Sequence, residues 1–94
     1  MELTKRRLQI CQFIAQFVAE KGFAPTFREI GRGVGLSSTS VVYNQILALE
    51  RIGALRRQHG YSRTIVLTPG FFTSLGQKAP HRKNDLLGVA SHAE

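Results

Sequence analysis

The side chains best suited to specific contacts are polar and aromatic residues near the middle of the chain. Ser40, Tyr43 and Asn44 stand at positions i, i+3 and i+4, so a helix would carry them on one side. Hydroxyl groups can donate or accept hydrogen bonds at base edges, and an asparagine amide can pair with adenine through two such bonds. This face therefore suits base recognition, with packing of Tyr43 against a preceding helix as the alternative.

The chain is also strongly basic. Its 94 residues include 13 lysines and arginines against 6 acidic residues, a net charge of +7. Ten basic and four acidic side chains lie in residues 1–69, so most of that charge is in the first part of the chain. A compact domain with this balance most often meets a polyanion such as DNA, RNA or an anionic membrane surface; solubility alone is the simpler alternative.

The residue types that enzymes and metal sites need are scattered. His59, His81 and His92 show no ligand spacing, and the sequence has no cluster of paired carboxylates. The glycines of residues 31–35 fall at the end of a short predicted helix, not between a strand and a helix as in a phosphate-binding loop. Cys11 is the one cysteine, and we expect a small core residue rather than a reactive thiol. The sequence predicts no enzyme, no cofactor, no metal and no small-molecule ligand.

No run approaches the ~20 apolar residues of a membrane-spanning helix. The basic residues 5–7 before an apolar stretch are similar to a signal peptide, but Gln9, Gln12 and Gln16 interrupt that stretch and no small-residue cleavage site follows. We expect a cytoplasmic protein without a membrane partner.

The first predicted helix begins after Thr4 as N-cap and ends near Lys21, where Gly22 can adopt the left-handed conformation. Its apolar residues recur at helical spacing and predict one apolar stripe on one face. The stripe consists of Ile10, Phe13, Ile14, Phe17 and Val18.

Two shorter helices follow. Thr26 and Glu29 form a predicted capping box for a helix over about residues 27–34. A third helix begins at Ser37-Ser38 and runs to about Arg51. Two helices joined by a tight turn that contains a glycine are typical of a helix-turn-helix. The third helix should bury Val42, Ile46 and Leu49 and turn outward Ser40, Tyr43, Asn44, Leu47 and Arg51.

The rest of the chain predicts a hairpin and a tail. Residues 54–58 and 63–68 flank a glycine turn, with Leu55, Ile65 and Leu67 toward the helices and a basic tip projecting as a wing. We expect a domain over residues 1–68 and a mostly irregular tail over 69–94, with room for one short helix. In that tail Phe71, Phe72 and Leu75 either pack on the domain or contact another chain.

Several segments match one known pattern in order and without gaps. Residues 3–6 fit the opening of its first helix, and residues 22–31 fit G-[YF]-x-P-[ST]-x-R-E-I. Residues 35–42 fit the start of its recognition helix, 49–53 with Arg56-Arg57 fit L-E-x-x-G-x-[IL]-x-R, and 63–65 fit R-x-I. From Leu3 to Leu67 the chain thus resembles the N-terminal DNA-binding domain of LexA-type repressors.

This resemblance implies a mainly α fold with a small β-hairpin, a three-helix winged helix-turn-helix whose third helix enters the major groove of operator DNA. Carried over by position, the base-reading candidates are Ser38, Ser40, Val41, Tyr43 and Asn44. Basic side chains would contact phosphates, which gives affinity but little sequence information; a solvated surface charge is the alternative for each. These candidates are Lys5, Arg6, Arg7, Arg28, Arg51, Arg56, Arg57 and Arg63.

The sequence also departs from the family. Full-length relatives continue into a self-cleaving peptidase domain with a Ser/Lys dyad. We expect the 94 residues to be too few to contain that domain, and Ser74 with Lys78 to be an ordinary polar pair. Residues 86–90 are similar to the segment before the family's cleavage site, as a remnant or by coincidence. The apolar Leu47 and the block 43–45 differ from common relatives, so the operator need not be the damage-response (SOS) box.

Two functions fit these observations. The first is a sequence-specific, double-stranded DNA-binding transcriptional regulator, most simply a LexA-like repressor without self-cleavage. One copy buries little surface, so we expect a homodimer on a palindromic operator, formed on DNA or through the tail. The alternative is a winged-helix interaction module that modulates a full-length repressor or RNA polymerase.

Overall fold

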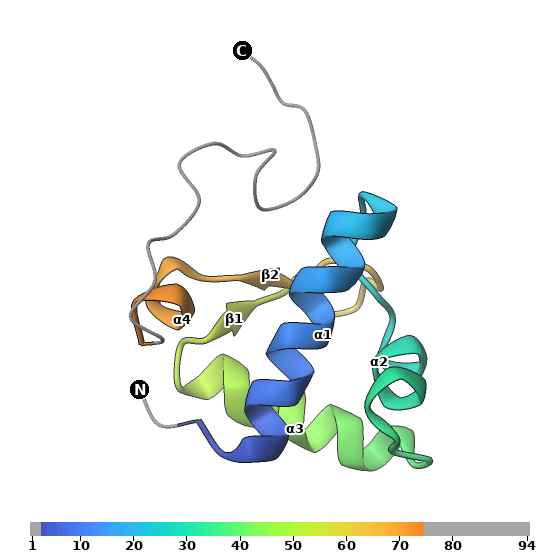
Figure 1. The fold of residues 1–94 in the computed structure, drawn as a ribbon. Coiled ribbons are helices and arrows are strands. Elements are labelled where there is room, and N and C mark those ends of the chain that lie inside the picture. Colours follow the sequence, from blue (N-terminus) through green and yellow to red (C-terminus); the bar gives the residue numbers. More distant parts are fainter. Residues whose placement is uncertain (1–2, 75–94) are drawn as a thin grey trace.

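The computed structural model describes residues 3–74, in which three helices come first and a short hairpin follows (Figure 1). The fold is a mainly helical winged helix-turn-helix, as predicted. Its elements are α1 (Lys5–Lys21), α2 (Phe27–Val34), α3 (Thr39–Arg51), β1 (Leu55–Arg56), β2 (Val66–Leu67) and α4 (Pro69–Ser74).

Local signals set both ends of α1. The Thr4 hydroxyl accepts a hydrogen bond from the Arg7 backbone N–H at 3.2 Å, which satisfies a free donor of the first turn. Gly22 ends the helix with φ of 84°, and its N–H donates to the Val18 carbonyl. Both predicted caps are confirmed, and Ile10, Ile14 and Val18 face the core as expected.

The capping box of α2 is present as predicted. The Glu29 N–H donates to the Thr26 hydroxyl at 3.1 Å, and the Thr26 N–H donates to the Glu29 carboxylate at 2.8 Å. Gly35 ends α2 with φ of 79°, a left-handed conformation that glycine adopts without steric cost. The chain then turns within a few residues into α3, for which Ser38 is the N-cap.

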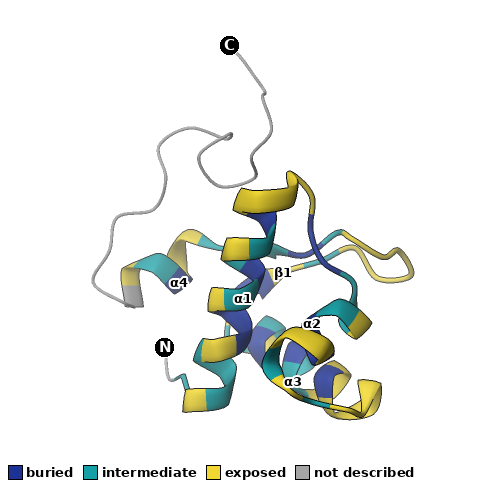
Figure 2. Cartoon of the chain, turned by 45° about the vertical axis from the view of Figure 1, so that its right-hand side comes forward, coloured by how far each residue is buried: buried dark blue, intermediate teal, exposed yellow. Residues whose placement is uncertain are grey.

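The wing is a two-stranded antiparallel ladder in which Leu55 pairs with Leu67 and Arg56 with Val66. Its strands are shorter than the predicted runs 54–58 and 63–68, because side chains rather than strand pairing organise the tip. The Thr64 hydroxyl accepts from the Gln58 N–H and lies within hydrogen-bond distance of the Gln58 and Tyr61 carbonyls. Figure 2 shows the exposed loop projecting past α2.

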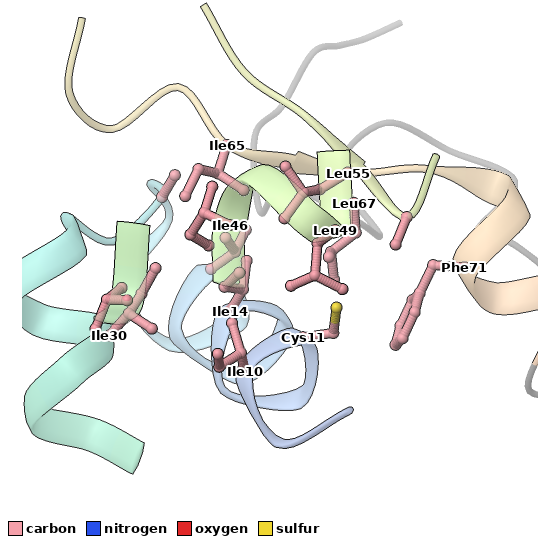
Figure 3. Packing of buried hydrophobic residues seen from close by; sticks show 14 residues of the cluster. Ile10, Cys11, Ile14, Ile30, Ile46, Leu49, Leu55, Ile65, Leu67 and Phe71 are labelled. Atoms are coloured by element: carbon pink, nitrogen blue, oxygen red, sulfur yellow. The ribbon is translucent and has the colours of Figure 1, made fainter. Parts of the chain in front are cut away.

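The core lies between the helices and the inner side of the hairpin (Figure 3). The predicted inward residues of the hairpin, Leu55, Ile65 and Leu67, are buried, as are Val42, Ile46 and Leu49 of α3. Cys11 is also buried, and burial raises the pKa of its thiol to about 12, which confirms a core residue.

The chain continues past the hairpin into α4, a short helix that the sequence analysis allowed within the otherwise irregular tail. Phe71 of this helix is only 2% exposed and belongs to the core cluster, while Phe72 is partly buried beside it. Packing on the domain, one of the two predicted alternatives, therefore holds for both rings. The described residues do not include Leu75, Lys78, His81, His92 or residues 86–90.

None of the helices in residues 3–74 is long and apolar enough to cross a membrane.

Candidate nucleic-acid interface

The outer side of α3 is polar at its N-terminal half. Ser40 and Asn44 are exposed, and Val41 and Tyr43 keep 43% and 42% of their surface exposed. Ser38 is exposed at the helix start, where its hydroxyl accepts from the Val41 N–H at 3.4 Å. The five base-reading candidates therefore lie together over the first turns of α3.

Two positions on α3 have mixed surroundings. The Tyr43 ring packs against Phe27 of α2, with centroids 5.8 Å apart, and still remains partly exposed. The alternative of packing against the preceding helix is therefore present, and base contact by the exposed part of the ring stays a prediction. Leu47, expected to face outward, is half-buried.

Four of the eight basic candidates are exposed and, within residues 3–74, hold no hydrogen bond or ion pair of their own. They are Lys5, Arg28, Arg51 and Arg56. Their charges are free to meet a solvent-borne anion.

The other four basic candidates have partners in the protein. At the start of α1, Arg6 donates to the Val34 carbonyl at 2.7 Å, and Arg7 donates to the Gln45 side-chain oxygen at 3.3 Å. These contacts tie the first turn of α1 to the end of α2 and to α3, so these side chains orient the helix-turn-helix.

Arg63 anchors the wing to α2. Its guanidinium binds the Glu29 carboxylate through two hydrogen bonds of 2.9 and 3.1 Å, donates to the Ala24 carbonyl, and lies 4.8 Å from the centroid of the Phe23 ring. The backbone of Arg63 has φ of 59°, an uncommon conformation for a residue with a side chain. The contacts around it hold that conformation in place.

Arg57 lies inside the angle between the wing and the helices. Its side chain is 8% exposed, and its Nε lies 3.3 Å from a Glu50 carboxylate oxygen. No hydrogen bond of good geometry forms at that Nε, so Arg57 and Glu50 interact there as an ion pair without a hydrogen bond. The guanidinium carbon lies 5.5 Å from the Phe27 centroid and 5.6 Å from the Tyr43 centroid.

Two carboxylates in this region have altered proton affinities. The hydrogen bond from Arg63 is the main cause that lowers the pKa of Glu29 below its usual value. The hydrogen bond with His59, at 2.7 Å, is the main cause that lowers the pKa of Glu50. Both carboxylates therefore stay charged at neutral pH and hold their partners.

An open hollow of about 420 Å³ separates the wing tip from the N-terminal ends of α2 and α3. Arg28 and Thr39 lie on the helical side, and Arg57, Tyr61 and Arg63 on the side of the wing. Tyr61 is 66% exposed and was not among the predicted site residues. An aromatic residue directly after the turn glycine was the signal that could have singled it out.

Within residues 3–74 there is no group of three or more His, Cys, Asp and Glu side chains that could hold a metal ion. The chemistry on this side of the molecule is that of hydroxyl, amide, aromatic and guanidinium groups, which suits binding to an anionic, hydrogen-bonding surface.

Comparison with known proteins agrees with this geometry. The family model of the LexA DNA-binding domain matches residues 1–64. A LexA repressor of Lactiplantibacillus plantarum is 41% identical over 86 residues, which cover 92% of this chain and 41% of the relative. One of Syntrophomonas wolfei is 44% identical over 66 residues, 70% of this chain and 32% of the relative. One of Streptomyces coelicolor is 51% identical over 55 residues, 58% of this chain and 24% of the relative. The chain thus spans less than half the length of these relatives.

Proposed function

Because this chain belongs to the LexA DNA-binding domain family, we propose that it binds double-stranded DNA sequence-specifically and regulates transcription, most simply as a repressor. The relatives that support the second part are named LexA repressors. We propose a binding protein rather than an enzyme, located in the cytoplasm with its DNA.

The observation that carries this proposal is the two-sided character of α3. One side is locked into the core by fully buried Val42, Ile46 and Leu49. The other presents Ser40, Tyr43 and Asn44 to solvent. A helix held in this way can lie in the major groove with its N-terminal residues at base edges.

The candidate residues of α3 can contact base edges in three ways. Asn44 can pair with an adenine through its amide, the hydroxyls of Ser38 and Ser40 can donate or accept, and Val41 can meet a thymine methyl group. Each good pairing of this kind contributes about 1–3 kcal/mol of discrimination against a wrong base.

Phosphate binding falls first to the exposed basic residues Lys5, Arg28, Arg51 and Arg56, since their charges have no partner among the described residues. Arg6, Arg7 and Arg63 have internal partners, and only their remaining N–H groups are free for DNA. The hollow between the wing tip and the helices would lie against the DNA backbone beside the major groove.

A single copy presents a small surface, so the proposal includes a pair of copies on an inverted repeat. Isolated modules of this size bury about 600–1,000 Å² of protein surface on DNA. A second copy on an adjoining half-site raises the affinity through avidity. Phe71 is buried in the core, so pairing on the DNA is favoured over pairing through that ring.

The test is selection of binding sites from a random duplex pool with the 94-residue chain, followed by binding at rising salt. We expect an enriched inverted repeat that is lost with Asn44→Ala. Because Asn44 is exposed, that variant should keep its thermal stability. Gln9→Ala, an exposed residue of α1, is the matched control and should retain the selected motif.

Binding with a steep salt dependence but no enriched motif would contradict base recognition. It would leave a basic surface that holds DNA without reading it, and would favour the protein-interaction module. Sedimentation that shows one copy on the selected site would contradict the dimer.

A further inference from the structure

Arg56 and Arg57 are neighbours in sequence, but the fold gives them opposite surroundings. Arg56 lies in β1 and is exposed. The Arg57 side chain is 8% exposed, because successive residues of an extended chain point to opposite sides. Two identical side chains on the wing therefore have different access to a DNA phosphate.

The Arg57 guanidinium contacts two rings from two helices. It lies 5.5 Å from the centroid of Phe27 in α2 and 5.6 Å from that of Tyr43 in α3, while the two rings lie 5.8 Å apart at 46°. A planar guanidinium attracts the faces of both rings and fills the space beside them. The three side chains thus form one packed group that joins the wing to the helix-turn-helix.

Glu50 is the charged partner of Arg57. Its carboxylate lies 3.3 Å from the Arg57 Nε and 2.7 Å from the His59 Nε2. The carboxylate belongs to α3 and both of its partners follow β1, so the base of the wing is tied to the helix that carries Tyr43. The Arg57 guanidinium therefore has a carboxylate beside its Nε and two aromatic rings beside its central carbon.

Tyr43 is the member of this group that reaches solvent. Its ring is 42% exposed, and its neighbours on α3 are the exposed Ser40 and Asn44. A side chain that reads a base must be kept within a narrow range of orientations by the residues behind it. Phe27 and Arg57 occupy the position of such a support.

We propose that Arg57 is a positioning residue, which sets the sequence preference of the interface by holding the Tyr43 ring rather than by contacting a phosphate. This inference rests on the proposed DNA-binding function and assigns a different role to one of its basic residues. It predicts that the loss of Arg57 changes which base is chosen and leaves the number of phosphate contacts unchanged.

The test compares Arg57→Met with Arg56→Met in site selection and in binding at several salt concentrations. Methionine keeps the length of the side chain and suits a buried position. For Arg57→Met we expect discrimination at the base facing Tyr43 to fall at least about fivefold, with the salt slope of wild type. For Arg56→Met we expect the wild-type base preference and a salt slope smaller by about 0.9.

A double-mutant cycle with Tyr43→Ala shows whether Arg57 acts through Tyr43. We expect Arg57→Met to reduce discrimination in the wild-type background and to have no further effect once Tyr43 is alanine. Equal effects in both backgrounds would overturn the inference, as would Tyr43→Ala with an unchanged base preference.

A direct measurement of the ring complements the binding data. The chain has two tyrosines and no tryptophan, so Tyr61→Phe leaves Tyr43 as the source of the tyrosine circular dichroism. We expect Arg57→Met to abolish most of that signal at unchanged far-ultraviolet signal. Arg57→Lys, which keeps the charge but lacks the planar guanidinium, should weaken it too and serves if Arg57→Met does not fold.

The outcomes separate this inference from the proposed function. If wild type selects no DNA motif, the proposed function fails and the inference fails with it. If wild type selects a motif while Arg57→Met keeps the base preference and lowers the salt slope, Arg57 grips a phosphate and only the inference is overturned.

Discussion

Gly31 is a residue of α2 that lies tightly against the turn leading into α3. A Cβ atom at this position would lie 2.8 Å from the Leu36 carbonyl oxygen and 3.1 Å from a Val42 methyl carbon. The Leu36 backbone cannot easily retreat, because its N–H donates to the Gly31 carbonyl at 2.8 Å. The angle between the two helices therefore depends on the absence of a side chain here.

We expect Gly31→Val to lower the free energy of unfolding by about 1–3 kcal/mol, the usual cost of overpacking a tight site. Urea denaturation followed by circular dichroism measures this change. Arg32→Ala, at the exposed neighbouring position, should change stability little. Equal stability of wild type and Gly31→Val would show that the turn can move away.

A second prediction at this scale concerns Cys11. Burial raises the pKa of its thiol to about 12, and only the thiolate reacts readily with disulfide reagents. We expect negligible labelling of the folded chain at pH 8 and complete labelling in denaturant, followed by absorbance of the released thiolate. Rapid labelling of the folded chain would show that the first helix opens easily.

At the scale of elements, the wing is held by side chains more than by its own ladder. The strands have two residues each, and a hairpin of this length is not stable by itself. Arg63 binds Glu29 of α2, and Arg57 lies beside Glu50 of α3. The orientation of the wing therefore depends on two carboxylates in the helices.

This dependence gives the domain a defined response to acid. The pKa of Glu29 and that of Glu50 lie below the usual 4.5 in the folded protein, so the unfolded chain binds protons more readily. Their contribution to stability is complete above about pH 4.5 and is lost as the pH falls through the lowered values. Thermal unfolding between pH 3 and 7 should show this decline.

Glu29→Gln isolates the contribution of Glu29 to the loss of stability in acid. Glutamine can still complete the capping box, so the change removes chiefly the charge that pairs with Arg63. We expect a loss of up to about 1 kcal/mol at pH 7 and a shallower decline in acid. A variant that declines as steeply as wild type would show that other groups cause the acid response.

The sequence predicted the helices closely because their ends depend on local residues such as Thr4, Gly22 and the pair Thr26 and Glu29. It predicted the strands too long, because the conformation of Arg63 and the bonds of Thr64 depend on the folded tip. It could not separate Arg56 from Arg57, since both are basic and only tertiary packing buries one. Helical periodicity was enough to place Ser40, Tyr43 and Asn44 on the exposed side of α3, but only the folded structure shows that Leu47 is half-buried.

At the scale of the whole molecule, the core is completed by a residue that follows the wing. Phe71 is 2% exposed and packs with buried residues of α1 and the hairpin in one cluster. The Thr68 hydroxyl accepts from the Phe71 N–H at 3.3 Å, which helps to start α4. A boundary at residue 68, as proposed from the sequence, would leave this ring outside the domain.

We expect Phe71→Ala to lower the free energy of unfolding by about 3–5 kcal/mol, a large part of the 5–15 kcal/mol typical of a domain. Thermal and urea unfolding measure the loss. Thr73→Ala, an exposed position in the same helix, is the control and should stay close to wild type. A small effect of Phe71→Ala would show that α4 is dispensable and would favour the boundary at 68.

The packing of Phe71 also has a consequence for the order in which the domain forms during synthesis. Ile10, Cys11 and Ile14 of α1 share one cluster with Ile65, Leu67 and Phe71, so α1 lacks some of its packing partners until the ribosome has added residues 65–71. At about 5–20 residues per second, its apolar side stays exposed on the order of seconds. The core that holds α3 in place is therefore incomplete until α4 has emerged from the ribosome.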